Sequence, residues 1–176
     1  MWHYLILVSL TMTTQMNNLF NFSSEAPINN WQIVSDGVMG GLSDSSIQLT
    51  KEGFGKFSGH VSLENNGGFT SVRLPSDVNV EKNEQEIVLK IKGDGKTYQC
   101  RLQGSKSQSE SYVHEFNTTG EWQTIKLKLK DFYPQYRGRK LKAPNFDFDK
   151  IKLFGFLISN KKEEDFTLLI DFIELK

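Results

Sequence analysis

Apolar and polar residues alternate in several short stretches of this chain, and a period of two residues predicts β-strands. Residues 86–92 and 122–129 place isoleucine and leucine at every second position, with mostly polar residues between them. Residues 151–158 are apolar at nearly every position, which is typical of a strand covered on both faces. The pattern predicts strands at 59–63, 69–74, 86–92, 97–103, 122–129, 151–158 and 166–175.

The links between these strands indicate an antiparallel arrangement. Gly93-Asp94-Gly95 is a short glycine-containing link of the kind that closes a β-hairpin. Helical periodicity is weak throughout, with single turns at most at 131–133 and 146–149. The chain is therefore predicted to be all-β, an antiparallel β-sandwich or jelly roll. Its core is expected to contain Ile87, Leu89, Ile91, Ile125, Leu127, Leu129, Phe154, Phe156, Leu168 and Ile170.

Two loops carry paired glycines and are expected to be shaped by them. Glycine adopts positive φ and lets two backbones approach closely, so at least one glycine of each pair is expected to serve one of these purposes. No helix-forming run follows either pair, so neither loop fits a phosphate-binding motif. The residues assigned to these structural loops are Asp36, Gly37, Gly40 and Gly41 in the first and Asn66, Gly67 and Gly68 in the second.

The length of 176 residues suits one domain with a substantial core. We assign this domain to residues 18–176 and treat 1–17 as an N-terminal extension. Residues 4–10 are apolar but too few to cross a bilayer, so no transmembrane segment is predicted. No lysine or arginine precedes them and no Ala-x-Ala follows, so the extension is interpreted as a mis-called start or a weak signal-like segment. We expect a cytoplasmic protein, or an exported one if this segment acts as a signal.

Charge and reactive side chains narrow the function classes. The 21 basic and 21 acidic residues cancel, so no general attraction to nucleic acid is expected. The one cysteine, Cys100, excludes an internal disulfide and is expected to be a small buried hydrophobe. Neither a nucleophile elbow nor a paired catalytic carboxylate is recognisable, so the chain is interpreted as a non-enzyme without a cofactor.

The spacing of potential metal ligands predicts no metal site. His3, His60 and His114 are scattered and do not converge on one point of a predicted strand. Asp36 and Asp171 are compatible with a calcium site of the kind that some jelly rolls hold. Turn capping or ion pairing is the favoured interpretation of both carboxylates.

Arginine is the most informative charged residue, because only four of the 21 basic residues are arginines and its fork suits bidentate partners. In residues 97–103, Arg101 shares the polar face with Gln99 and Gln103. Structural ion pairs, such as one between Arg101 and Asp171, are one interpretation. A polar groove for a carboxylate, a sugar or a peptide backbone is the other. The candidate binding face comprises Arg73, Gln99, Arg101, Gln103, Tyr136, Arg137 and Arg139.

Several segments together resemble the complex I intermediate-associated protein 30 family, the assembly-factor family of respiratory NADH:ubiquinone oxidoreductase. The matching segments span residues 18–176, and the Asp-Gly-Val-Met-Gly-Gly and Asn-Gly-Gly-Phe elements are specific in combination. The matching residues are 31–43 (WQIVSDGVMGGLS), Gly59 with 61–63, 66–73 (NGGFTSVR), 122–123, 131–134 with 137–139, Ile151, 154–158 (FGFLI) and 166–173 (FTLLIDFI).

The resemblance implies a galactose-binding-like jelly roll without established catalytic residues, in a compact bacterial-type member of the family. It further implies protein contacts with respiratory-complex subunits or assembly intermediates. The function expected from it is a non-enzymatic protein-binding module of the assembly-factor or chaperone type.

A carbohydrate-binding module is the alternative, because folds of this type often hold sugars on a concave sheet face. Sugar sites present exposed aromatic rings beside polar residues, so the aromatic side chains decide how well this alternative fits. Two of the candidate rings, Tyr98 and Trp122, are also candidates for the core. The candidates for stacking on a sugar are Tyr98, Tyr112, Trp122 and Tyr136.

Overall fold

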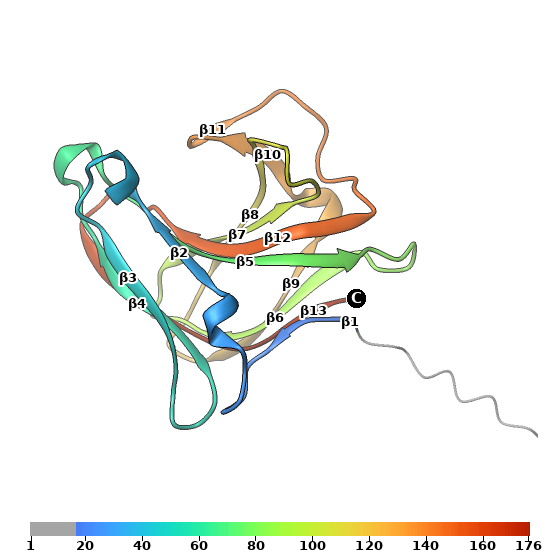
Figure 1. Cartoon of the computed structure of the whole chain (residues 1–176), viewed down its shortest axis with the longest axis horizontal. Helices are drawn as coiled ribbons and strands as arrows, with labels where there is room; N and C mark the ends of the chain where they lie inside the picture. The colour runs from blue at the N-terminus through green and yellow to red at the C-terminus, as the bar shows by residue number, and fades with distance from the viewer. Residues whose placement is uncertain (1–16) are drawn as a thin grey trace, which may run out of the picture.

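The computed structural model describes residues 17–176 and confirms the all-β sandwich, with two antiparallel sheets facing one another (Figure 1). In spatial order, the six-stranded sheet contains β3 (Asp44–Leu49), β4 (Gly55–Val61), β13 (Glu164–Leu175), β6 (Glu86–Lys92) and β9 (Trp122–Lys128), with β1 (Asn17–Asn21) also paired to β13. The seven-stranded sheet contains β11 (Arg139–Lys140), β10 (Tyr133–Tyr136), β8 (Ser111–Asn117), β7 (Thr97–Gln103), β12 (Lys150–Ile158), β5 (Thr70–Asn79) and β2 (Gln32–Ser35). The expectations for residues 1–16 lie outside the described residues.

Single 3-10 turns are the only helical elements in the part of the chain that the structure describes. They are η1 (Ile28–Asn30), η2 (Asp36–Met39), η3 (Glu64–Asn66) and η4 (Leu129–Asp131). The turn expected at 131–133 therefore occurs two residues earlier, and residues 146–149 form none. Within residues 17–176, no helix is long and apolar enough to cross a membrane.

Each expected strand is present: β6 and β7 have the expected ends, and the other five are shifted at one or both ends. Six further strands were not anticipated. The strands that alternation missed are β1, β2, β3, β8, β10 and β11. Two of them, β10 and β11, are only four and two residues long, too short to show a period. The strand β3 reads Asp-Ser-Ser-Ile-Gln-Leu and lies at a sheet edge. An edge strand is held by backbone hydrogen bonds to one neighbour, so it forms without a strong apolar pattern.

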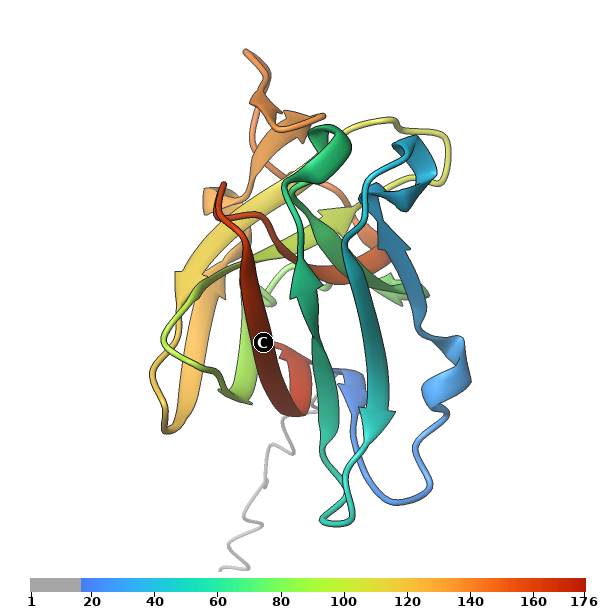
Figure 2. The ribbon, with the colours of Figure 1, turned by 90° about the vertical axis from the view of Figure 1, so that its left-hand side faces the viewer.

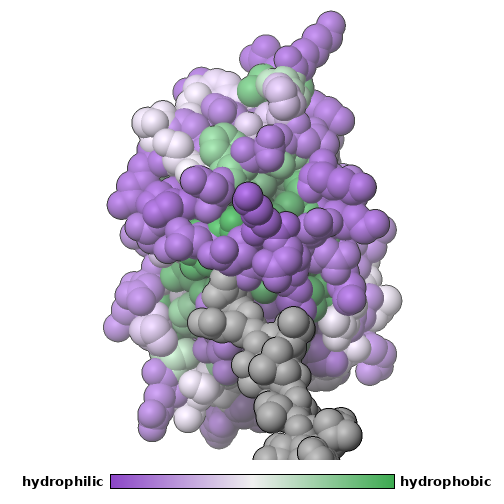
Figure 3. Space-filling view, turned by 90° about the vertical axis from the view of Figure 1, so that its right-hand side faces the viewer, coloured by the Kyte–Doolittle hydropathy of each residue, from purple (hydrophilic) through white to green (hydrophobic). Residues whose placement is uncertain are grey.

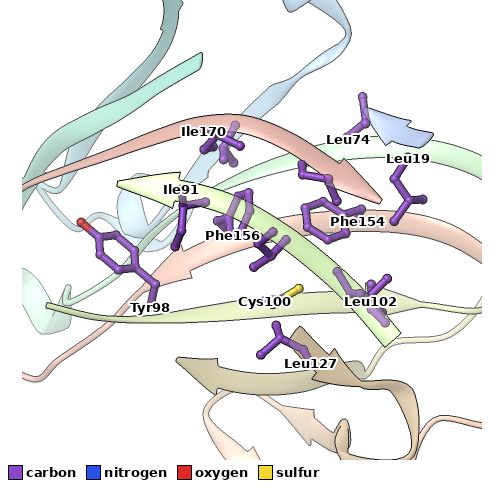
Figure 4. Packing of buried hydrophobic residues seen from close by; sticks show 14 of the residues in the cluster. Leu19, Leu74, Ile91, Tyr98, Cys100, Leu102, Leu127, Phe154, Phe156 and Ile170 are labelled. Atoms are coloured by element: carbon purple, nitrogen blue, oxygen red, sulfur yellow. The ribbon is translucent and has the colours of Figure 1, made fainter. Parts of the chain in front are cut away.

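The expected core lies between the two sheets. Nine of the ten residues expected there are buried, and the tenth, Ile125, is partly buried. Figure 4 shows Phe154 and Phe156 of β12 packed among side chains from β6, β7 and β13. Cys100 has no exposed surface, and burial raises the pKa of its thiol, so it behaves as a packed hydrophobe. Alternation in β7 then turns residues 99, 101 and 103 away from the core, onto the outer face of the seven-stranded sheet.

Candidate functional site

A buried carboxylate joins the two glycine loops. Asp36, at the start of η2, has no exposed surface. Its Oδ2 accepts hydrogen bonds from the backbone N–H groups of Gly68 at 2.7 Å and Phe69 at 3.2 Å, both in the second loop. Ser43 donates its backbone N–H at 3.0 Å and its hydroxyl at 2.5 Å to the same carboxylate. Burial acts to raise the pKa of Asp36, but these hydrogen bonds outweigh it, and the pKa lies below its usual value.

The paired glycines are placed around this carboxylate. Gly40 has a φ of 89° and Gly68 a φ of 129°, in the region that side chains rarely adopt. A Cβ on Gly41 would lie 2.3 Å from the Asp36 Oδ1, and a Cβ on Gly67 would lie 2.7 Å from its Oδ2. Each pair therefore contains one glycine at positive φ and one packed against Asp36.

Four apolar side chains are exposed on these joined loops. Ser43 accepts a hydrogen bond from the Ser62 N–H at 3.0 Å, which ties the bases of the loops together. Figure 2 shows η2 and η3 at the same end of the sandwich. We call these exposed side chains the apolar loop tip: Val38 (76% exposed), Met39 (63%), Leu42 (55%) and Leu63 (44%).

The outer face of the seven-stranded sheet holds two of the candidate arginines side by side. Arg101 of β7 and Arg73 of β5 both pair with Gly155 of β12, the strand between them. Directly paired residues point to the same side of a sheet, so both side chains rise from one face, on either side of a residue without a side chain. This face is the upper side of the upper sheet in Figure 1. We call it the arginine face and define it by Arg73, Gln99, Arg101, Gln103, Gln135 and Gly155.

Arg101 is partly buried and contacts amides rather than acids. Its Nη1 donates to the side-chain oxygens of Gln99 at 3.1 Å and Gln135 at 3.3 Å. Burial, followed by the neighbouring charge of Arg73, lowers the pKa of Arg101 to about 10, so it stays protonated at neutral pH. Asp171 lies in β13 of the other sheet, so the structure does not contain the Arg101–Asp171 clamp that was the alternative.

Arg73 is also withdrawn from water without an acidic partner. Burial lowers the pKa of its guanidinium. Within residues 17–176, the ion pairs of basic side chains all use lysine or histidine. The two guanidinium groups therefore face each other's charge with no carboxylate between them.

The hairpin formed by β10 and β11 does not complete this face as expected. Gln135 pairs with Lys140, and Tyr136 pairs with Arg139. Since Gln135 reaches Arg101, alternation turns Tyr136 and Arg139 to the opposite side of the hairpin. The guanidinium of Arg137 instead lies over the Tyr136 ring, 5.4 Å from its centroid. The structure thus brings together Arg73, Gln99, Arg101 and Gln103, and leaves Tyr136, Arg137 and Arg139 apart from them.

Two members of the arginine face were missed from the sequence. Gln135 joins Arg101 only because β10 pairs with β8, a pairing that no local pattern reveals. Gly155 had a detectable signal, because a lone glycine inside an apolar strand often marks a close approach of another group. A Cβ there would lie 2.6 Å from the Val72 carbonyl oxygen and 3.4 Å from the Arg73 Cγ.

The aromatic residues proposed for sugar stacking are mostly unavailable. Tyr98 and Tyr112 are buried members of the core cluster. Trp122 is half-buried and packs against Phe54 with ring centroids 4.7 Å apart. Only Tyr136 among the four is exposed, at 41%, and it points away from Arg101.

A pocket of about 510 Å³ lies elsewhere, where the 80–86 segment meets residues 128–130 and 146–149. Figure 3 faces this end of the molecule and shows hydrophobic side chains between hydrophilic ones. Its lining mixes both signs of charge with the rings of Phe146 and Phe148, which specifies no ligand chemistry.

No group of three or more potential metal-binding side chains occurs within residues 17–176, and the Asp36 carboxylate is occupied by hydrogen bonds instead.

Sequence comparisons place the chain beside mitochondrial proteins. The family model described as complex I intermediate-associated protein 30 matches residues 20–170. The mouse protein named complex I intermediate-associated protein 30, mitochondrial, is 24% identical over 90% of this chain and 56% of its own length. A probable complex I intermediate-associated protein 30 of Caenorhabditis elegans is 23% identical over 88% of this chain and 52% of its own length. The chain therefore spans about half the length of these relatives.

Comparison of the folds identifies carbohydrate-binding modules. The family 11 module of the cellulase Lic26A-Cel5E from Clostridium thermocellum aligns with a TM-score of 0.66 and 18% identity, over 91% of this chain and 93% of the module. A family 29 carbohydrate-binding module aligns with a TM-score of 0.54 and 12% identity, over 92% and 91% of the respective chains. An agarase, AgWH50C, aligns at 0.61 and 16% over 92% of this chain and 24% of the enzyme. At these identities the likeness establishes the fold alone.

Proposed function

The chain belongs to the complex I intermediate-associated protein 30 family, and we propose that it is a non-enzymatic module that binds a partner protein during assembly of a respiratory complex. The partner expected on this basis is a complex I subunit or an assembly intermediate. The mouse and nematode relatives bear names that refer to intermediates of that complex.

The observation that carries this proposal is the apolar loop tip. Isolated apolar residues on a surface are ordinary, but several exposed apolar side chains gathered on two joined loops are typical of an interaction site. Val38 and Met39 extend from η2, and Leu42 follows in the same loop. Asp36 holds this loop against the one that carries Leu63, so the tip is presented by a rigid base. A pre-organised apolar tip loses little conformational entropy on binding, which favours affinity.

The test is capture from a lysate of the source organism, with bound proteins identified by mass spectrometry. Wild type is expected to recover complex I subunits or intermediates, and the M39D/L42D double variant is expected to lose them. Leu141→Asp is the matched control, since Leu141 is an exposed leucine (36%) outside the loop tip. Recovery of the same subunits by M39D/L42D, with its fold checked by circular dichroism, would contradict the proposal.

A carbohydrate-binding function is the second candidate, favoured by the similarity in fold to family 11 and family 29 modules. Against it, Tyr98 and Tyr112 are buried and Trp122 packs on Phe54, so only Tyr136 of the four proposed stacking rings is exposed. Titration with a panel of neutral β-glucan and galactan oligosaccharides tests it. Binding at millimolar sugar that is lost in Arg101→Gln would support it, and absence of any heat or spectral change would remove it.

A further inference from the structure

Arg73 and Arg101 are two like charges on the arginine face, and their proximity lowers the stability of the folded chain. Arg73 and Arg101 are both withdrawn from water, and the charge of Arg73 adds to burial in lowering the pKa of Arg101. Burying a charge without a partner is unfavourable, and like charges in proximity add to that cost. Within residues 17–176, no carboxylate forms an ion pair with either guanidinium. Such an arrangement is stabilised when an anion binds between the two groups.

The hydrogen-bond donors of both groups are also incompletely used. Of the Arg101 nitrogens only Nη1 has partners, the amide oxygens of Gln99 and Gln135. Arg73 donates no side-chain hydrogen bond within the described residues. An arginine carries five N–H donors in a planar fork, so most of the donors of this pair remain available to a ligand.

The strand between the two arginines presents a glycine, beside which the stem of Arg73 packs closely, 3.4 Å from the position a Cβ would take. Gly155 separates them in the ladder and contributes no side chain. Neighbouring strands are about 4.8 Å apart, so the two arginine backbones are roughly 10 Å apart across β12. Two extended guanidinium groups can converge on one small group over such a span.

We infer that the arginine face binds a carboxylate of the partner protein, held between Arg73 and Arg101 above Gly155. A carboxylate matches the guanidinium fork in a bidentate manner, and such charge-assisted hydrogen bonds are about twice as strong as neutral ones. The amides of Gln99 and Gln135 hold Arg101 in place and orient its fork. This inference rests on the proposed protein-binding function, but it concerns a surface distinct from the apolar loop tip.

An acidic side chain fits this face better than an acidic sugar does. Sugars in binding sites are usually packed against exposed aromatic rings, and the ring nearest Arg101 that the sheet register offers is Tyr133. The ammonium of Lys140 lies 4.6 Å from the centroid of that ring and covers it. The amides of Gln99, Gln103 and Gln135 suit the peptide groups beside an aspartate or glutamate of a partner. Glu115 also lies on this face, where its carboxylate accepts a hydrogen bond from the Gln99 Nε2 at 3.2 Å and forms no ion pair with either arginine.

The test uses a fluorescein-labelled oligo-glutamate peptide, with an oligo-glutamine peptide and oligogalacturonate as the alternative probes. Fluorescence anisotropy is measured for wild type, Arg73→Gln, Arg101→Gln and the double variant. The matched control is Arg139→Gln, which removes the same charge from the other side of the β10–β11 hairpin. Each variant's melting temperature is measured in parallel, so that misfolding is recognised.

The expected result is binding of oligo-glutamate but not oligo-glutamine, weakened at least about tenfold in Arg101→Gln and Arg73→Gln. Arg139→Gln should bind within about twofold of wild type, since its effect is limited to long-range charge. Perturbation of the Arg73 and Arg101 Nε–H signals in NMR spectra upon peptide addition would locate the contact.

Three outcomes would overturn the inference. The first is that wild type does not bind oligo-glutamate at about 1 mM peptide. The second is that Arg139→Gln and Arg101→Gln lose peptide affinity equally. The third is that only oligogalacturonate binds, and that this binding depends on the two arginines. If complex I proteins are still captured through the apolar loop tip in any of these cases, the carboxylate site fails and the proposed function stands. Loss of capture in M39D/L42D has no bearing on the peptide titration, so the two failures are distinguishable.

Discussion

Asp36 and Arg101 are both charged side chains withdrawn from water, but Asp36 has a full set of hydrogen-bond donors around it and Arg101 has no opposite charge paired with it within residues 17–176. The Asp36 carboxylate accepts hydrogen bonds from Ser43, Gly68 and Phe69 and binds two loops together. Arg101 contacts two amide oxygens and has another arginine as its charged neighbour. A buried charge whose partners are all present stabilises the fold. One whose partners are missing lowers stability and is explained by a ligand that arrives later.

The largest expected effect on stability comes from removing the Asp36 carboxylate. Asp36→Ala leaves three backbone N–H groups and a hydroxyl without their acceptor, and hydrogen bonds to a charged group count for more than neutral ones. We expect a loss of about 3–5 kcal/mol in the free energy of unfolding, measured by urea denaturation. Asp131→Ala, at an exposed aspartate, is the control and should change little. If Asp36→Ala lowers the free energy of unfolding by less than about 1 kcal/mol, the carboxylate is not a major source of stability.

The same centre predicts a dependence of stability on pH. Because the pKa of folded Asp36 lies below its unfolded value of 3.8, its ionised form stabilises the protein fully above that pH. That contribution is lost as the pH falls from about 4 toward the folded pKa. The difference in unfolding free energy between wild type and Asp36→Asn should therefore shrink below pH 4. A difference that stays constant from pH 6 to pH 3 would contradict the assignment.

Crowding the centre is expected to have the next largest effect. In Gly41→Ala the new Cβ lies 2.3 Å from the Asp36 Oδ1, so the carboxylate or the loop must shift. We expect a loss of about 1–3 kcal/mol, in the range found for overpacked sites. Gly120→Ala is the matched control, because nothing lies within 4 Å of its added Cβ. Equal stability of the two variants would show that the first loop adapts freely.

Removing the Arg101 charge, which has no opposite charge as partner among the described residues, should not lower the free energy of unfolding. Arg101→Met keeps a long apolar stem and eliminates a partly buried cation that forms no ion pair in the described part of the chain. We expect the free energy of unfolding to stay the same or rise by up to about 1 kcal/mol. Arg139→Met, at an exposed arginine, should lie within about 0.5 kcal/mol of wild type. A substantial loss in Arg101→Met alone would make that residue a structural one.

The ion pair between His60 and Asp165 lies at the surface and should contribute least to stability. The hydrogen bond from His60 to Asp165, at 2.8 Å, is the main reason that the pKa of His60 is raised, and Glu163 adds to it. A raised pKa means that this contribution is present below pH 6.5 and is lost as the pH rises through the folded pKa. His60→Gln should therefore be slightly less stable at pH 5.5 and indistinguishable at pH 8, measured by thermal unfolding. The reverse order would show that the ion pair is not formed in solution.

Much of this protein was determined by the sequence alone. Alternation identified the core strands β6, β7 and β9, because an amphipathic strand has only one way to turn its apolar face inward. The paired glycines marked both shaped loops, and Arg101 was placed with Gln99 and Gln103, since a period of two puts them on one face.

Only the tertiary structure decided which distant groups meet. Asp36 reaches Gly68 across 32 positions of sequence, and Arg73 lies beside Arg101 because both pair with β12. The β10–β11 hairpin was expected on the arginine face, but its register turns Tyr136 and Arg139 away and leaves Gln135 there. Strand order and register are set by the packing of the whole core, whereas side-chain alternation is a property of each strand. The local pattern therefore predicts which face a residue occupies, and the pairing of the sheets decides its neighbours.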